Sequence, residues 1–255
     1  MRSCLTVLLQ IVVAVLLFAG CSTPPRTEST PPPKPELTIQ IAALNYSAVN
    51  RRIEKKDVAQ FAKVLRREQV DVLAVRGLVR YPGLATRVDL LTELAAQADL
   101  RTAFGEMMNN SGRQTGNAVF SLYPIQSSHS QPFEGVKVAT VESALRATID
   151  AGVHSISIVS AEIPEKANAE EQAQCAHVIE SLDLLSPVIA AGNLPPVTPA
   201  GMLDAAPLLG SDHLPPGTGL WYTRGVLKPV SVRIVHTDLG PLLIGRFEVY
   251  RAAQP

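Results

Sequence analysis

Hydrophobic and polar positions follow two different periods along this chain. Leu37, Ile39 and Ile41 alternate with polar or small residues, a pattern that is typical of a β-strand and that ends near Asn45. Apolar residues then recur at helical spacing over residues 58–65, which predicts an amphipathic helix. Further strands are predicted at residues 71–75, 117–122, 144–149, 155–160, 187–191, 230–235 and 242–249, and further helices at residues 88–95 and around Cys175.

The order of these elements predicts an α/β fold built from two sheets. Strands and helices interleave, yet several neighbouring strands have the pattern of hairpin or meander partners. This combination favours two sheets packed face to face, because helices then cover the outer faces. We therefore expect a two-sheet α/β sandwich, in which Thr86 caps the helix at residues 88–95.

The amino terminus has the features of a secretory signal peptide. Arg2 precedes an apolar run over residues 5–18, which is shorter than the roughly 20 residues that a membrane-spanning helix needs. Residues 18–21, Phe-Ala-Gly-Cys, resemble the lipobox of bacterial lipoproteins, in which the cysteine is acylated and becomes the first residue. We expect residues 1–20 to be removed and Cys21 to carry the lipid, with palmitate among its acyl chains. An ordinary signal peptide that is cleaved elsewhere is the alternative.

The lipobox resemblance also implies a location. Ser22 after the cysteine is similar to lipoproteins that are sorted to the outer membrane. The chain is therefore expected in a bacterial cell envelope, facing the periplasm where an outer membrane exists. Residues 21–36 are rich in proline and favour polyproline II, which makes them a semi-rigid tether. Residues 37–255 have the length of one ordinary domain.

The charge balance disfavours nucleic acid as a partner. Lysine plus arginine number 23 and aspartate plus glutamate also number 23, so the chain has no basic excess to neutralise phosphates. Once Cys21 is acylated, the remaining cysteine of the mature chain is Cys175, which excludes an intramolecular disulfide. The helical spacing of Cys175 with Val178, Ile179 and Leu182 predicts a buried thiol rather than a reactive one.

Four segments resemble motifs of the endonuclease/exonuclease/phosphatase family. Residues 116–125, GNAVFSLYPI, are similar to the family's GNAILSRYPI and form the most specific match. Residues 71–75 (DVLAV), 144–147 (ALRA) and 187–192 (PVIAAG) are similar to other family segments, in the family's order and spacing. The resemblance covers nearly all of residues 37–249 and implies the family's two-sheet α/β sandwich.

The resemblance also implies a metal-dependent phosphoesterase ancestry with most catalytic positions replaced. Family enzymes hydrolyse phosphate esters with magnesium, which requires carboxylate ligands, a base and donors to the phosphate. Asn45 matches the family's first motif. Gly77, which follows Arg76, stands where the family has its main magnesium-binding glutamate, and Glu162 stands where the family has a phosphate-contacting histidine.

The last two family motifs are altered as well. Asn193 and Pro195 stand in the family's Asp-x-Asn motif, and Pro195 removes a side-chain amide together with a backbone donor. In the final Asp-His pair Asp238 is retained, whereas Leu239 replaces the histidine that acts as the general base. A Ser-Asp-His triplet at residues 211–213 (Ser211, Asp212, His213) lies upstream of the matching position, and we interpret it as a loop; a long loop that folds over the cleft is the alternative.

These replacements favour a protein that keeps the fold without the chemistry. Loss of a general base alone costs about 10² to 10⁴ in rate, and loss of the main metal carboxylate removes the ion that offsets transition-state charge. We therefore expect no cofactor and a role in binding or envelope organisation, with the membrane and an unidentified protein as partners. The alternative is a divergent phosphoesterase in which Glu162, Asp238, Asn45 and Asn193 form a new magnesium site.

Overall fold

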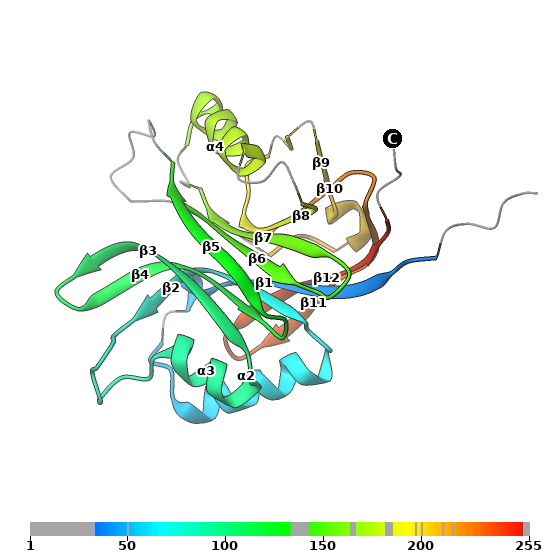
Figure 1. Ribbon diagram of the computed structural model, residues 1–255. Coiled ribbons are helices and arrows are strands. Elements are labelled where there is room, and N and C mark those ends of the chain that lie inside the picture. The colour runs from blue at the N-terminus through cyan, green and yellow to red at the C-terminus, as the bar shows by residue number, and fades with distance from the viewer. Residues whose placement is uncertain are drawn as a thin grey trace, which may run out of the picture. The chain divides into compact units, whose positions relative to one another are not determined.

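Two six-stranded β-sheets pack face to face, with helices on both outer faces (Figure 1). The computed structural model describes residues 34–49, 51–133, 143–163, 167–181, 186–196, 198–199, 201–210, 212–215 and 217–251. The predicted signal peptide and Cys21 lie outside the described residues. Among the residues described, no helix is long and apolar enough to cross a membrane. The two-sheet α/β sandwich expected from the sequence is confirmed.

The first sheet has the strand order β11-β12-β1-β2-β4-β3. Its central pair, β1 and β2, runs parallel, and the other neighbours run antiparallel. Asn45 at the end of β1 lies opposite Arg76 of β2. The strand bounds are β1 Leu37–Asn45, β2 Val72–Arg80, β3 Arg101–Asn110, β4 Arg113–Ser121, β11 Leu227–Thr237 and β12 Gly240–Val249.

The second sheet has the order β5-β6-β7-β8-β10-β9. It also contains a central parallel pair, β7 and β8, in which Glu162 lies opposite Asn193. The remaining neighbours are antiparallel. The strand bounds are β5 Ile125–Pro132, β6 Ser143–Asp150, β7 Ser155–Glu162, β8 Val188–Asn193, β9 Met202–Asp204 and β10 Leu220–Thr223.

Helical crossovers join the two parallel pairs. Helix α2 (Lys55–Arg67) connects β1 to β2, and α4 (Ala169–Ser181) connects β7 to β8, since parallel neighbours cannot be joined by a tight turn. Helix α3 (Leu90–Ala98) packs beside α2. In Figure 1, α2 and α3 lie on one side of the molecule and α4 lies on the opposite side. Two short 3-10 helices, Tyr46–Ala48 and Ala206–Leu209, follow β1 and β9.

Acidic residues cap the two helices beside the first sheet. Glu54 and Asp57 form a reciprocal capping box at the start of α2. Helix α3 begins at Asp89, whose carboxylate accepts a hydrogen bond from the Leu91 backbone N–H at 3.2 Å. The predicted cap Thr86 is therefore wrong, because the helix starts three residues later and Asp89 immediately precedes its first turn.

Three apolar layers stabilise the sandwich. Along β1 the alternation sends Ile41 and Ala43 into the inter-sheet layer, and it sends Ala42 and Leu44 into the layer beneath α2 and α3. A third layer, between the second sheet and α4, contains Cys175, which is fully buried as its helical spacing predicts. The inter-sheet layer gives way to polar side chains at one end, and those side chains form the candidate site.

Candidate functional site

Four polar side chains face inward where the central parallel strands end. On β1 and β2, Asn45 and Arg76 continue the faces that carry apolar inter-sheet residues two and four positions earlier. On β7 and β8, Glu162 and Asn193 occupy the equivalent positions. Carboxyl ends of parallel strands are where α/β sheets usually place their ligands. We call these four residues the end cluster.

An ion pair joins the two sheets within the end cluster. The Arg76 Nη1 atom donates to Glu162 Oε1 at 2.6 Å. The Arg76 side chain is only 5% exposed and that of Glu162 is 17% exposed, so the pair is shielded from most of the solvent. A second link between the sheets runs from the Ser160 hydroxyl to the Val75 carbonyl at 3.0 Å. The arginine therefore points into the sandwich rather than toward solvent.

Position 77 faces the same place but has no room for a long side chain. Gly77 has φ +64°, and a Cβ atom there would lie 2.7 Å from the Ser47 Cβ and 3.3 Å from Glu162 Oε2. Its backbone N–H donates to Asn117 Oδ1 at 3.3 Å, and Asn117 Nδ2 in turn donates to the Ser143 carbonyl at 2.8 Å. A carboxylate at position 77 would meet steric crowding and the negative charge of Glu162.

A loop from the second sheet covers the arginine. Gly217 has φ +68°, and a Cβ atom there would overlap the Arg76 guanidinium. The loop is held by Thr218, a buried residue whose hydroxyl donates to the Pro215 carbonyl at 2.6 Å. The loop that carries the Ser-Asp-His triplet therefore reaches the site, but through its glycine. His213 is exposed.

The remaining residues of the Ser-Asp-His triplet are exposed or lie outside the described residues, and the two asparagines of the end cluster form local hydrogen bonds. Asp212 is exposed and Ser211 lies outside the described residues. Asn45 Oδ1 accepts from the Ser47 hydroxyl at 2.6 Å. Asn193 Nδ2 donates to the Ile163 carbonyl at 2.9 Å. Local hydrogen bonds thus already engage both amides.

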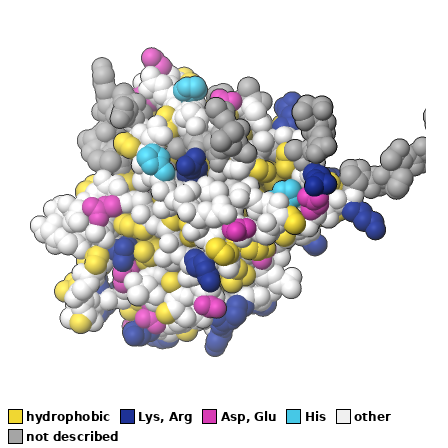
Figure 2. All heavy atoms as spheres, in the orientation of Figure 1, with side chains coloured by type: hydrophobic (Ala, Val, Ile, Leu, Met, Phe, Trp, Pro, Cys, Tyr) yellow, Lys and Arg dark blue, Asp and Glu magenta, His cyan; other side chains and the backbone are white. Residues whose placement is uncertain are grey.

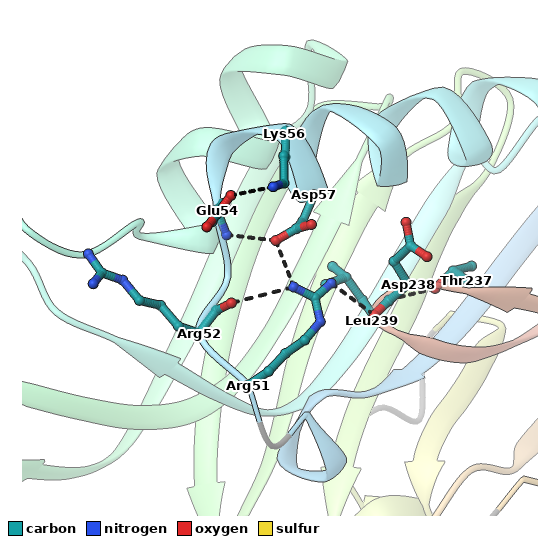
Figure 3. A network of polar contacts seen from close by, with 8 residues as sticks. All are labelled: Arg51, Arg52, Glu54, Lys56, Asp57, Thr237, Asp238 and Leu239. Atoms are coloured by element: carbon teal, nitrogen blue, oxygen red, sulfur yellow. Dashed lines mark hydrogen bonds and ion pairs between the residues drawn. The ribbon is translucent and has the colours of Figure 1, made fainter.

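Pro195 and the two residues of the final motif differ in their exposure. Pro195 is buried just after β8. Asp238 is exposed on the turn between β11 and β12, and its backbone carbonyl accepts from Arg51 Nη2 at 3.3 Å (Figure 3). Leu239, only 1% exposed, packs in the apolar layer beneath α2 and α3. A hydrocarbon side chain there cannot take a proton from water.

The side chains of the end cluster do not fit a magnesium ion. Magnesium requires several oxygen ligands, usually including one or two carboxylates. Glu162 is the one carboxylate of the cluster, and a guanidinium already binds it. Across the part of the chain that the structure describes, no group of three or more His, Cys, Asp or Glu residues could hold a metal. What the geometry does provide is an ion pair that connects the two sheets.

The alternation pattern carried a signal for this contact that motif matching missed. Arg76 follows Val72 and Ala74 at period two, and Glu162 follows Ile158 in the same way. Two opposite charges at equivalent ends of two facing strands are placed to meet. The covering role of Gly217 has no comparable signal, because it depends on the path of a loop.

Comparisons with known proteins identify the fold. No protein-family model and no curated protein matches this sequence. An endonuclease/exonuclease/phosphatase protein from Beutenbergia cavernae has a TM-score of 0.64 at 16% identity, covering 84% of this chain and 72% of that one. The Bacteroides vulgatus protein has a TM-score of 0.64 at 11% identity, covering 84% and 100%. The human Nocturnin catalytic domain, with bound sulfate, has a TM-score of 0.61 at 14% identity, covering 83% and 94%.

Proposed function

This chain has the fold of the endonuclease/exonuclease/phosphatase proteins, and we propose that it is a lipid-anchored envelope protein whose domain does not hydrolyse phosphate esters. Its role is to bind a partner or to organise the envelope, since a fold does not dictate an activity. The observation that carries the proposal is the buried Arg76–Glu162 ion pair at the carboxyl ends of the central strands.

The ion pair opposes metal binding by charge. Any attraction of Glu162 for a divalent cation is offset by the repulsion of Arg76, because the two charged groups are only 2.6 Å apart. Asn45 and Asn193 are neutral and engaged in local hydrogen bonds. The site therefore presents no net negative charge to hold a dication, and Gly77 supplies no further ligand.

The missing base supports the same conclusion independently. A general base must lie within hydrogen-bond reach of the attacking water. Leu239 stands at the family's position for that base and is buried in an apolar layer.

The proposed anchoring through Cys21 rests on the sequence, in which the apolar run ends directly before Ala19-Gly20-Cys21.

Turnover of a generic phosphodiester tests the proposal. The full chain, purified in a neutral detergent, is incubated with bis(p-nitrophenyl) phosphate and either magnesium or manganese. We expect the rate to equal that of metal in buffer alone. Substitution of the exposed Glu106 by alanine serves as the control for removing a carboxylate away from the end cluster.

Two results would contradict the proposal in distinguishable ways. Metal-dependent turnover that disappears in both Glu162→Ala and Asp238→Ala, but survives in Glu106→Ala, would establish a rewired metal site. Turnover that disappears only in His213→Ala would identify the exposed histidine of the covering loop as the base. Either result would show that the domain is catalytically active.

A further inference from the structure

A pocket of about 410 Å³ lies beside the end cluster and is lined by an unusual set of arginines. Its walls come from the loop between β1 and α2, from the end of β2 with the loop to α3, and from the start of β4. Arg51, Arg52, Arg87 and Arg113 all line the pocket, and no aspartate or glutamate does. Ser47 belongs both to this lining and to the surroundings of Gly77.

Three of these guanidinium groups have no acidic partner among the described residues. Arg52 donates to a backbone carbonyl, that of Thr86. Arg87 lies over the Tyr81 ring, 5.4 Å from its centroid. Arg113 is exposed at the first position of β4. Figure 3 shows that the Arg52 side chain extends away from Arg51, whose Nη1 donates to the Arg52 backbone carbonyl at 3.4 Å.

Two acidic side chains nearby, Asp57 and Asp89, are already paired with arginines. Asp57 pairs with Arg51 at 2.8 Å, and Asp89 pairs with Arg80 at 2.7 Å. Basic and acidic side chains are interspersed on the face shown in Figure 2, and the whole chain has equal numbers of both. The positive charge of the pocket is therefore a local arrangement and not a consequence of composition.

Two tyrosines add hydroxyl groups to the walls. Tyr46 and Tyr81 both line the pocket. Burial raises the pKa of Tyr46, and Tyr81 and Asp89 raise it further, while Arg51 lowers it. The net pKa is above the ordinary value, so the Tyr46 hydroxyl keeps its proton and can donate a hydrogen bond.

We propose that this pocket binds a diphosphate group, on a soluble molecule or in a lipid headgroup. Guanidinium groups match phosphate oxygens through paired hydrogen bonds. A single phosphate monoester carries about 1.5 to 2 negative charges at neutral pH, so two linked phosphates match three uncompensated cations better than one. The pocket volume is also in the range of small-molecule sites, about 300 to 1,000 Å³. The inference rests on the proposed binding role and gives that role a ligand class.

Calorimetric titration with pyrophosphate, without divalent metal, tests the inference on the full chain in a neutral detergent. The Arg87→Gln/Arg113→Gln variant removes two guanidinium groups that form no hydrogen bond to a described side chain, so the fold is spared. Each lost charge-assisted contact is expected to weaken binding by about tenfold, and the double variant by about 100-fold. Arg101→Gln, at the opposite end of the β3–β4 hairpin, makes the same charge change at an exposed residue outside the lining. It should bind like the parent chain.

Two outcomes would overturn the inference: no saturable binding at millimolar pyrophosphate, or an equal loss of affinity in Arg101→Gln.

A second experiment, with the chain anchored in phosphatidylcholine vesicles, distinguishes a soluble ligand from a lipid headgroup. Weaker pyrophosphate binding after addition of a polyprenyl diphosphate, but not after addition of phosphatidylglycerol at equal charge, supports a lipid headgroup in the pocket. Unchanged affinity with both lipids supports a soluble diphosphate. Absence of binding leaves the hydrolysis result untouched, and metal-dependent hydrolysis leaves the binding result untouched, so the two proposals fail separately.

Discussion

Replacing Glu162 by glutamine tests whether the ion pair holds this end of the sandwich together. The substitution keeps the side-chain size and removes the carboxylate that faces a guanidinium with 5% exposure. Removing one partner of a buried pair costs roughly 3 to 5 kcal/mol. Because Glu162 keeps some access to water, we expect Glu162→Gln to lower the free energy of unfolding by about 3 kcal/mol, at the lower end of this range. That corresponds to a fall in Tm of about 6 to 12 °C for a domain of this size.

The buried Trp221 is the single tryptophan of the chain and reports the unfolding in urea. Arg76→Met and the double variant Arg76→Met/Glu162→Gln complete a double-mutant cycle. The double variant should cost less than the sum of the singles, with a coupling of about 2 kcal/mol, because neither charge is then left buried alone. Lys56→Gln, which breaks the exposed pair with Glu54, should leave the midpoint unchanged. The reasoning would be refuted if each single variant lowered the free energy of unfolding by less than about 1 kcal/mol and the two losses added without coupling.

Three further predictions concern other parts of the chain. Cys21→Ala should abolish labelling by a fatty acid and association with membranes; an unlipidated parent chain cut at another site would disprove this. Burial alone would raise the pKa of Asp89, but hydrogen bonds and charge from Arg80 hold this pKa below its ordinary value. The ionised Asp89 therefore stabilises the fold at pH values above the ordinary pKa, and this stabilisation is lost as the pH falls through the lower pKa of the folded state. The stability lost in Asp89→Asn at neutral pH should therefore shrink below about pH 4, and a pH-independent difference would contradict it. Gly217→Ala should cost about 1 to 3 kcal/mol more than Gly225→Ala, because both have positive φ but only the first adds a clash with a guanidinium; equal costs would show that the loop does not press on the site.

Strong periodicity made part of the fold predictable from sequence. The strand that starts at Leu37 ends at Asn45 as predicted, and the apolar spacing around Phe61 gives α2. The order of strands and helices predicted the two-sheet sandwich, and motifs with the family's order and spacing implied the same fold. These elements were predictable because each buries a face against the core.

An exposed edge strand, a short strand and the extension of β2 escaped prediction. β5 has the sequence IQSSHSQP and lies at the edge of its sheet, bonded only to β6, so its position depends on hydrogen bonds more than on apolar burial. β10 has only four residues, and three of them are buried. β2 runs to Arg80, beyond the predicted apolar segment, with a register shift between Val75 and Leu78 around Gly77, whose positive φ is typical of a bulge.

The candidate site was predictable as a set of positions and not as a set of contacts. Sequence comparison located Gly77, Glu162 and Leu239, each on its own segment. The partner of Glu162 is 86 residues away, and motif matching treats the two residues separately, although the alternation along their strands places both side chains on inward faces. Asp238 shows the same limit, because a matching residue type in the sequence turned out to lie exposed on a turn beside Arg51.

A structure of crystals soaked in manganese would show whether the end cluster binds a divalent metal. Anomalous scattering would locate the metal without any assumption about activity, because manganese takes the same oxygen ligands as magnesium. We expect no anomalous peak at the end cluster and a hydrogen bond between Arg76 and Glu162 that is unchanged by the metal. A manganese ion bound to the Glu162 carboxylate, with Arg76 displaced, would contradict it.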